Sequence, residues 1–77
     1  MNYYYLKGLI TVKLKDFIDL YAGEETLLCL LSDDGNEYEE YIIDETIAST
    51  RKIDKMWLNG YVNYFYFDDA LRVNVSI

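Results

Sequence analysis

Residues 26–43, TLLCLLSDDGNEYEEYII, decide the fold of this chain. Residues 26–31 form an apolar run that is too short for a stable helix, which is typical of a central strand buried on both faces. The next residues include Asp34-Gly35-Asn36, which predicts a hairpin because these residue types tolerate the positive φ of tight turns. Residues 37–43 then form a half-exposed return strand, in which the consecutive carboxylates Glu39-Glu40 indicate a β-bulge.

The segment before this hairpin predicts a strand and a helix. Residues 3–10 are aromatic and apolar enough for a strand. Residues 12–22 predict a short amphipathic helix, with Thr11 as its N-cap and Gly23 just beyond its C-terminal end. The apolar side chains of this helix recur at helical spacing and are Leu14, Phe17, Ile18 and Tyr21.

Residues 44–58 admit two interpretations. The first is a short helix or an irregular crossing that begins at a capping Asp44. The second is a strand over residues 53–58 that turns at Asn59-Gly60, a strong two-residue hairpin signal. We favour the first interpretation and keep the strand as the alternative.

The end of the chain predicts a closing hairpin. Residues 61–67 are β-branched and aromatic, residues 68–70 supply a turn, and residues 71–77 alternate apolar and polar side chains. Tyr64 and Tyr66 share one face of their strand, so we expect one face in the core and a partly exposed aromatic strip on the other. The predicted core consists of Leu14, Phe17, Ile18, Leu28, Leu30, Val62, Val73 and Val75.

These elements predict a single α+β domain over residues 1–77. Its sheet is expected to be antiparallel with four or five strands, and one short amphipathic helix packs on one face. A chain of 77 residues has no room for a second core. Hydrophobic residues make up 52% of the chain, which excludes a disordered tail.

Side chains that carry catalysis are scarce. The chain has no His and one Cys, which excludes His-based catalysis, His-ligated metals and an internal disulfide. Cys29 lies within the leucine run, where it behaves as a small hydrophobic residue. A calcium loop aligned on Gly35 fails because Leu30 falls on a ligand position. We therefore expect no enzymatic activity, no metal and no cofactor.

Signals for membrane insertion or export are not found. No apolar run approaches the ~20 residues that a membrane span requires. Residues 1–5, MNYYY, do not form the basic start of a signal peptide. We therefore expect a cytoplasmic protein that has no membrane partner.

The charged residues are distributed unevenly. The net charge is −7, from 14 acidic and 7 basic residues, and residues 16–45 hold 11 of the acidic ones and no basic one. Because a negative surface is repelled by phosphates, we expect no direct binding of nucleic acid. Alternate strand residues such as Glu37 and Glu39 lie about 6.6 Å apart on one face. That pitch is close to the spacing of successive phosphates, so a row of carboxylates can occupy a basic nucleic-acid channel.

Three segments resemble short proteins of bacterial prophages and mobile elements: residues 11–18 (TVKLKDFI), 33–37 (DDGNE) and 70–75 (ALRVNV). In size, acidity and lack of catalytic residue types, the chain is also similar to phage-encoded inhibitors of host defence, the anti-CRISPR proteins above all. The resemblance implies a location in the cytoplasm of a bacterial host cell. It also implies that the partner is a host defence protein, such as a nuclease or a CRISPR effector.

Charge and resemblance together predict a non-enzymatic acidic protein that blocks the basic nucleic-acid-binding cleft of such a partner by charge mimicry. Tyrosines are expected to anchor the contact, since Tyr is enriched at interfaces. The expected partner-binding residues are Asp33, Asp34, Glu37, Tyr38, Glu39, Glu40, Asp44, Glu45, Tyr64 and Tyr66. The alternative is a structural or assembly module that forms a homodimer or larger homo-oligomer through its Tyr-rich strands.

Overall fold

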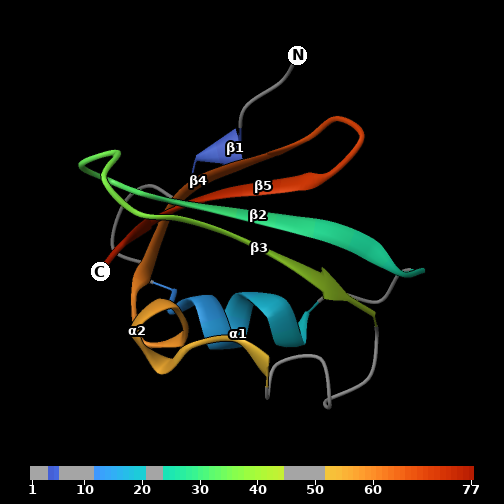
Figure 1. Cartoon of the computed structure of the whole chain (residues 1–77), viewed down its shortest axis with the longest axis horizontal. Coiled ribbons are helices and arrows are strands. Elements are labelled where there is room, and N and C mark those ends of the chain that lie inside the picture. The colour runs from blue at the N-terminus through green and yellow to red at the C-terminus, as the bar shows by residue number, and fades with distance from the viewer. Residues whose placement is uncertain (1–3, 6–11, 21–23, 45–51) are drawn as a thin grey trace.

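The computed structural model describes residues 4–5, 12–20, 24–44 and 52–77, which form a five-stranded sheet with two short helices on one side (Figure 1). This arrangement confirms the predicted α+β class, with a sheet of four or five strands and a short helix packed on one face. In chain order the elements are β1 (Tyr4–Tyr5), α1 (Leu14–Asp19), β2 (Thr26–Ser32), β3 (Tyr38–Ile43), α2 (Lys55–Leu58), β4 (Tyr61–Phe67) and β5 (Leu71–Ser76).

The strands lie in the order β1-β4-β5-β2-β3. The β1–β4, β4–β5 and β2–β3 pairs are antiparallel, whereas the central β2–β5 pair is parallel. The sheet is therefore mostly antiparallel, with one parallel pair that the sequence did not predict. The two hairpins lie side by side with their most apolar strands, β2 and β5, in contact, because that placement buries these strands most completely.

The core lies between the sheet and the two helices. The parallel register places Leu28 beside Leu71 and Leu30 beside Val73, so that these side chains share one face. The rest of the core consists of residues from the helices and the other strands that are fully or almost fully buried. The predicted core is thereby confirmed. Phe17 is only partly buried and packs against Phe65 at a ring-centroid distance of 4.8 Å.

Helix α1 is shorter than the helix predicted over residues 12–22. It begins after Lys13, whose side chain makes no capping hydrogen bond, and its C-cap is Leu20 rather than a residue near Gly23. The predicted caps Thr11 and Gly23 lie outside the described residues. So does most of the strand predicted over residues 3–10, of which only β1 is described.

Helix α2 is capped by Asp54, whose carboxylate accepts a hydrogen bond from the Met56 backbone N–H at 2.8 Å. In the described part of residues 44–58 the helical interpretation is therefore confirmed, and the alternative strand over residues 53–58 is wrong. The Asn59-Gly60 pair instead joins α2 to β4. A Cβ at Gly60 would lie 2.5 Å from Val75 Cγ1 and 2.8 Å from the Ser76 carbonyl oxygen, so close packing against β5 requires glycine here.

The turn between β2 and β3 confirms the predicted hairpin. Gly35 has a φ of 78°, in the region that glycine adopts without strain. Its N–H donates to the Ser32 carbonyl oxygen at 3.0 Å. The Asp34 carboxylate accepts from the Ser32 hydroxyl at 2.6 Å and from the Asn36 N–H at 2.9 Å, which closes the turn on both sides.

The β-bulge predicted at Glu39-Glu40 is wrong. The β2–β3 register runs without a shift from Thr26↔Ile43 to Leu31↔Tyr38. The irregularity lies instead in β4, between Val62 and Tyr64. Val62 and Phe65 both face the core although they are three residues apart, and strict alternation would separate them. One extra residue in β4, Asn63, shifts the alternation of side chains by one position, so that Val62 and Phe65 lie on the same face.

Candidate interaction surface

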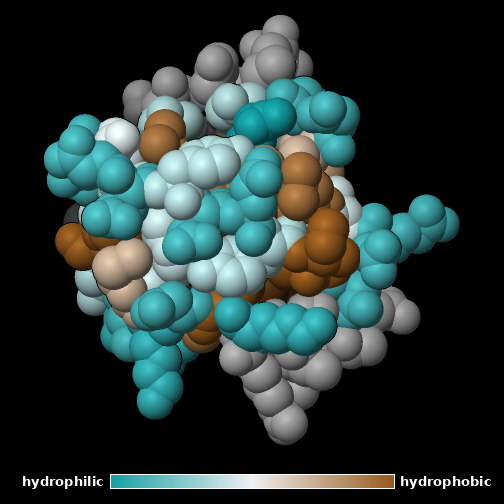
Figure 2. All heavy atoms as spheres, in the orientation of Figure 1, coloured by the Kyte–Doolittle hydropathy of each residue, from teal (hydrophilic) through white to brown (hydrophobic). Residues whose placement is uncertain are grey.

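The helices cover one face of the sheet, and no described element covers the other (Figure 1). We call this uncovered side the open face. The cross-strand register assigns to it the side chains of Cys29, Leu31, Tyr38, Glu40, Ile42, Tyr64, Tyr66, Arg72 and Asn74. In Figure 2, weakly polar side chains in pale tones gather over the strands, with teal polar groups between them and brown apolar groups beside them.

A shallow pocket of about 130 Å³ lies on the open face. Three tyrosines, Tyr38, Tyr64 and Tyr66, form its walls together with Cys29 and Arg72. This volume is below the ~300–1,000 Å³ of typical small-molecule sites. In the part of the chain that the structure describes, no group of three His, Cys, Asp or Glu side chains is arranged to hold a metal ion. The open face is thus better suited to contact with another surface than to enclosing a substrate.

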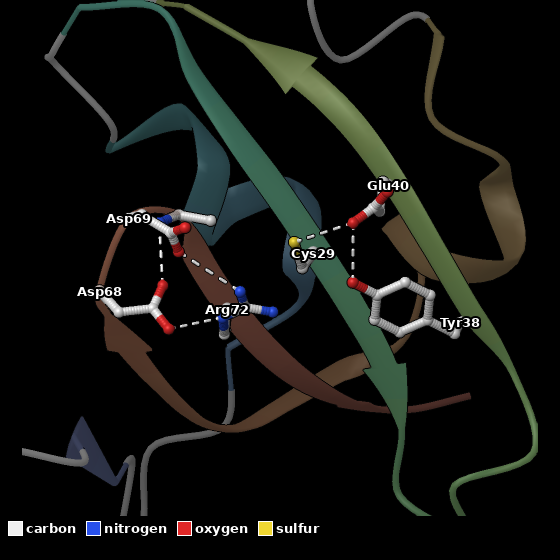
Figure 3. A network of polar contacts seen from close by, with 7 residues as sticks. Cys29, Tyr38, Glu40, Asp68, Asp69 and Arg72 are labelled. Carbon is white, nitrogen blue, oxygen red and sulfur yellow. Dashed lines mark hydrogen bonds and ion pairs between the residues drawn. The ribbon is translucent and has the colours of Figure 1, made fainter. Parts of the chain in front are cut away.

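Tyr38, Glu40 and Cys29 form a polar cluster on the open face (Figure 3). The Tyr38 hydroxyl donates to Glu40 Oε2 at 2.9 Å, and Cys29 Sγ donates to the same oxygen at 3.6 Å. The neighbouring Cys29 thiol, and next the hydrogen bond to Glu40, raise the pKa of Tyr38 well above its ordinary value. Tyr38 therefore stays protonated and remains a donor. Although its side chain lies on the open face, Cys29 is only 3% exposed, as expected for a small hydrophobic residue within the leucine run.

Arg72 is held by the turn between β4 and β5 (Figure 3). Its Nε lies 2.8 Å from Asp68 Oδ2 and its Nη2 lies 3.4 Å from Asp69 Oδ1. Desolvation acts to raise the pKa of Asp68, but hydrogen bonds from the Ala70 N–H and from Arg72 outweigh it, and the pKa is lowered. The positive charge of Arg72 is therefore matched locally and does not offset the carboxylates of the β2–β3 hairpin.

The predicted acidic residues lie where the hairpin places them. Five carboxylates on the turn and on β3 are exposed, and we call them the hairpin acids: Asp33, Asp34, Glu37, Glu39 and Glu40. Asp44 is half-buried at the end of β3, and Glu45 lies outside the described residues. In the described part of the chain, no lysine or arginine forms an ion pair with a hairpin acid.

The hairpin acids do not form one continuous row. Glu39 lies opposite Leu30 and is therefore on the helix-covered side of the sheet, whereas Glu40 lies opposite Cys29 on the open face. Asp34 is engaged in the turn, and Glu40 accepts from Tyr38. The sequence predicts these residues on one hairpin, but only the strand register assigns Glu39 and Glu40 to opposite faces.

Sequence reasoning missed two features of the open face. One is the pairing of Arg72 with Asp68, for which the spacing of four residues around a turn was an available signal. The other is a polar cluster in which the Asn63 side-chain amide donates to Asn74 Oδ1 and to Ser76 Oγ, each at 2.9 Å. The sequence contains no local signal for this cluster because it depends on the bulge in β4.

Comparison of the chain with protein-family models, curated proteins and solved structures gives no match. None of the helices in the described residues has the length and apolar character needed to cross a bilayer.

Proposed function

We propose that this chain is a non-enzymatic acidic binding protein that docks onto the basic nucleic-acid-binding cleft of a host defence protein, as a phage-type inhibitor does. The observation that carries the proposal is the exposure of all five hairpin acids, none of which is ion-paired within the described residues. Like charges gathered without partners repel one another and lower stability. A cationic partner would remove that repulsion on binding.

The same charge selects the kind of partner. A surface with this sign repels nucleic acid directly but attracts a protein cleft that is built to bind phosphates. Association would be electrostatically steered, and therefore fast at low salt and slower at high salt. Tyr38, which is 50% exposed and adjoins Glu39 and Glu40, supplies an anchor with both apolar and polar character.

The test compares two double charge reversals. The protein and its Glu37→Lys/Glu39→Lys variant are used as baits in bacterial lysate, and the association rate with any captured protein is then measured against salt concentration. The matched control is Asp19→Lys/Glu25→Lys, which makes the same change in net charge at exposed positions in α1 and just before β2, away from the turn and from β3. We expect the hairpin variant to associate much more slowly, with a flatter salt dependence. The association rate of the control variant should fall less.

Competition completes this test. A captured protein that binds the chain through its nucleic-acid cleft must release DNA or RNA when the chain is added. Equal rates and salt slopes for the two double variants, or simultaneous binding of chain and nucleic acid, would contradict the proposal. The hairpin acids would then serve only to keep the surface soluble.

The second candidate function is an assembly module that forms homo-oligomers. The observation that favours it is the open face, which no described element covers and which carries Tyr38, Tyr64 and Tyr66 around a shallow pocket. Light scattering over a range of protein concentrations tests it. A mass that rises with concentration, and that falls to the monomer value in Tyr64→Ser/Tyr66→Ser, would support assembly; a monomer at every concentration would exclude it.

A further inference from the structure

We propose that β3 binds an extended, basic segment of the partner protein as an added strand at the edge of the sheet. This inference rests on the proposed function and specifies the part of the partner that β3 contacts: an extended basic segment of the nucleic-acid-binding cleft that can pair as a strand. Three features of β3 carry it, namely its position in the sheet, the direction of its backbone groups and the placement of its side chains.

The position of β3 leaves one side of its backbone without a strand. It is the last strand in the order β1-β4-β5-β2-β3, and no strand in the described part of the chain pairs with its outer edge. A strand edge of this kind is a template for an additional strand. The exposed residues Tyr38, Glu39, Glu40 and Ile42 keep this edge at the surface.

The hydrogen-bond phase shows which residues face outward. The Ser32 N–H donates to the Glu37 carbonyl oxygen at 3.0 Å and the Glu37 N–H donates to the Ser32 hydroxyl at 3.0 Å, so the backbone groups of Ser32 and Glu37 face each other and hold a bonded position of the ladder. Bonded and non-bonded pairs alternate along an antiparallel ladder. In an uninterrupted register, Glu39 and Tyr41 therefore direct their N–H and C=O groups toward β2. The corresponding groups of Tyr38, Glu40 and Ile42 point to the outer edge.

The side chains of β3 explain why the edge is the best approach. Glu39 and Glu40 lie on opposite faces of the sheet. A partner that lies flat on either face reaches one carboxylate and leaves the other in solvent. A strand added in the plane of the sheet alternates its own side chains between the two faces, and so it reaches both.

The same register defines the sequence of the added strand. Tyr38 and Ile42 are 50% and 54% exposed and flank Glu40 on the open face. An antiparallel segment that pairs with residues 42 to 38 would therefore place an apolar residue opposite Ile42 and basic residues opposite Glu40 and Glu39. A second apolar residue would lie opposite Tyr38. Read from its N-terminus, the segment is apolar, any residue, basic, basic, apolar.

A second copy of this chain does not fit the edge. Pairing β3 with β3 of another molecule would bring carboxylates of both copies together, and like charges opposite one another destabilise a sheet. Charged residues on an edge strand can also serve only to prevent pairing with other chains. If that is their sole role here, a basic strand should not bind to β3. The experiment below separates this role from strand addition.

The probe is a short synthetic peptide with the core Val-Thr-Lys-Arg-Val between uncharged polar residues, labelled for fluorescence anisotropy. Two N-methylated forms keep every charge and side chain. One form carries methyl groups on the amide nitrogens of the first Val and of Lys, which face β3. The other form carries them on the amide nitrogens of Thr and Arg, which face away from β3. We expect the first form to bind at least about tenfold more weakly than the parent and the second to bind almost as well.

Equal affinity of the two methylated peptides would overturn strand addition and leave docking by charge alone, with the proposed function intact. No binding of any of the peptides at low salt would also overturn it, and would assign the edge acids a protective role. Conversely, if the parent peptide binds in the methylation-dependent way but Glu37→Lys/Glu39→Lys does not slow association with the captured protein, strand addition stands and the proposed function fails.

Amide hydrogen exchange in the protein supplies an independent readout. Peptide binding should slow the exchange of the Tyr38, Glu40 and Ile42 amides, which point outward. The Glu39 and Tyr41 amides, which are already directed to β2, should change much less. Uniform protection along β3, or none, would contradict the proposed register.

The carboxylates are tested one at a time in the protein. Glu39→Gln and Glu40→Gln should each weaken binding of the parent peptide several-fold, because the added strand reaches both faces. The control is Asp19→Gln, which removes an exposed charge from α1 and should leave the affinity almost unchanged. Sensitivity to only one of the two glutamates would indicate docking on a single face and would overturn the inference.

Discussion

Neighbouring residues in β2 have very different surroundings. Leu30 is fully buried and lies between Glu39 of β3 and Val73 of β5, with its side chain toward the helices. Leu31 points to the open face and is 38% exposed. Because the two side chains are the same, their different burial follows from the face of the sheet on which each lies.

We therefore predict that Leu30→Ala lowers the free energy of unfolding by ~2–5 kcal/mol, as expected for a large-to-small change in a closely packed core. Leu31→Ala serves as the matched control and should cost clearly less, because solvent already reaches that side chain. Urea titration of both variants gives the comparison. Equal losses would mean that β2 is not buried against the helices in the way described.

The ionisation of Asp34 makes the stability of the fold depend on pH. The hydrogen bond from the Ser32 hydroxyl, followed by that from the Asn36 N–H, lowers its pKa below the ordinary value of 3.8. A carboxyl with a lowered pKa stabilises the folded state above its unfolded pKa, and this contribution is lost as the pH falls through the folded pKa.

Asp34→Asn should therefore be less stable than the original protein at neutral pH, and the difference should shrink as the pH falls below about 4. Urea midpoints measured across this range give the result. Taking the difference between the urea midpoints of the two proteins at each pH cancels the effect of the other carboxylates, which titrate in both. A difference that stays constant with pH would show that the ionised form of Asp34 does not support the turn.

At the scale of the elements, the bulge in β4 has the largest consequences. It lets Val62 pair with Val75 and Phe65 pair with Val73, so that both aligned side chains enter the core. It also brings Asn63 within hydrogen-bond distance of Asn74 and Ser76 on the open face. One inserted residue thus serves the packing of one face and the polar cluster of the other.

Deletion of Asn63 should place Val62 or Phe65 on the wrong face of the sheet, and we expect the product to lose cooperative unfolding. Asn63→Ala keeps the phase and removes only the hydrogen bonds. It should fold, with a loss of ~1–3 kcal/mol because the largely buried Asn74 loses a partner. Circular dichroism during urea titration distinguishes the two. A deletion variant as stable as Asn63→Ala would show that the bulge is dispensable.

At the scale of the whole molecule, the charge is unbalanced. The net charge is −7, and the ion pairs of Arg72 lie at the other hairpin, away from the exposed hairpin acids. Surface charges separated by about 10 Å are screened at ordinary ionic strength, so the repulsion depends on salt.

We expect the stability of the protein to rise when salt is added, because added ions screen this repulsion. Glu37→Lys/Glu39→Lys should keep the fold, should be as stable or slightly more stable at low salt, and should gain less from added salt. Urea rather than guanidinium is the denaturant, since it adds no ions. A salt response identical in both proteins would mean that the hairpin acids do not repel one another measurably.

Much of the local structure could be predicted from particular residues. The run around Leu28 and Leu30 indicated a strand between two others, and Gly35 indicated the turn, because each signal depends only on nearby backbone and side-chain chemistry. The exposed position of the hairpin acids followed directly. The helix caps were predicted less well, since the carboxylate that caps α2 belongs to Asp54 and not to Asp44.

The sequence by itself determined that the segments of β2, β3, β4 and β5 are strands, where the first hairpin turns and where the negative charge collects, because short-range sterics and burial govern these features. Only the tertiary structure decided that β2 and β5 pair in parallel, that β4 carries the bulge, and that Glu39 and Glu40 face opposite sides of an edge. These features arise when segments far apart in the chain bury their apolar faces together. A single-residue change of register would reverse which carboxylate lies on the open face.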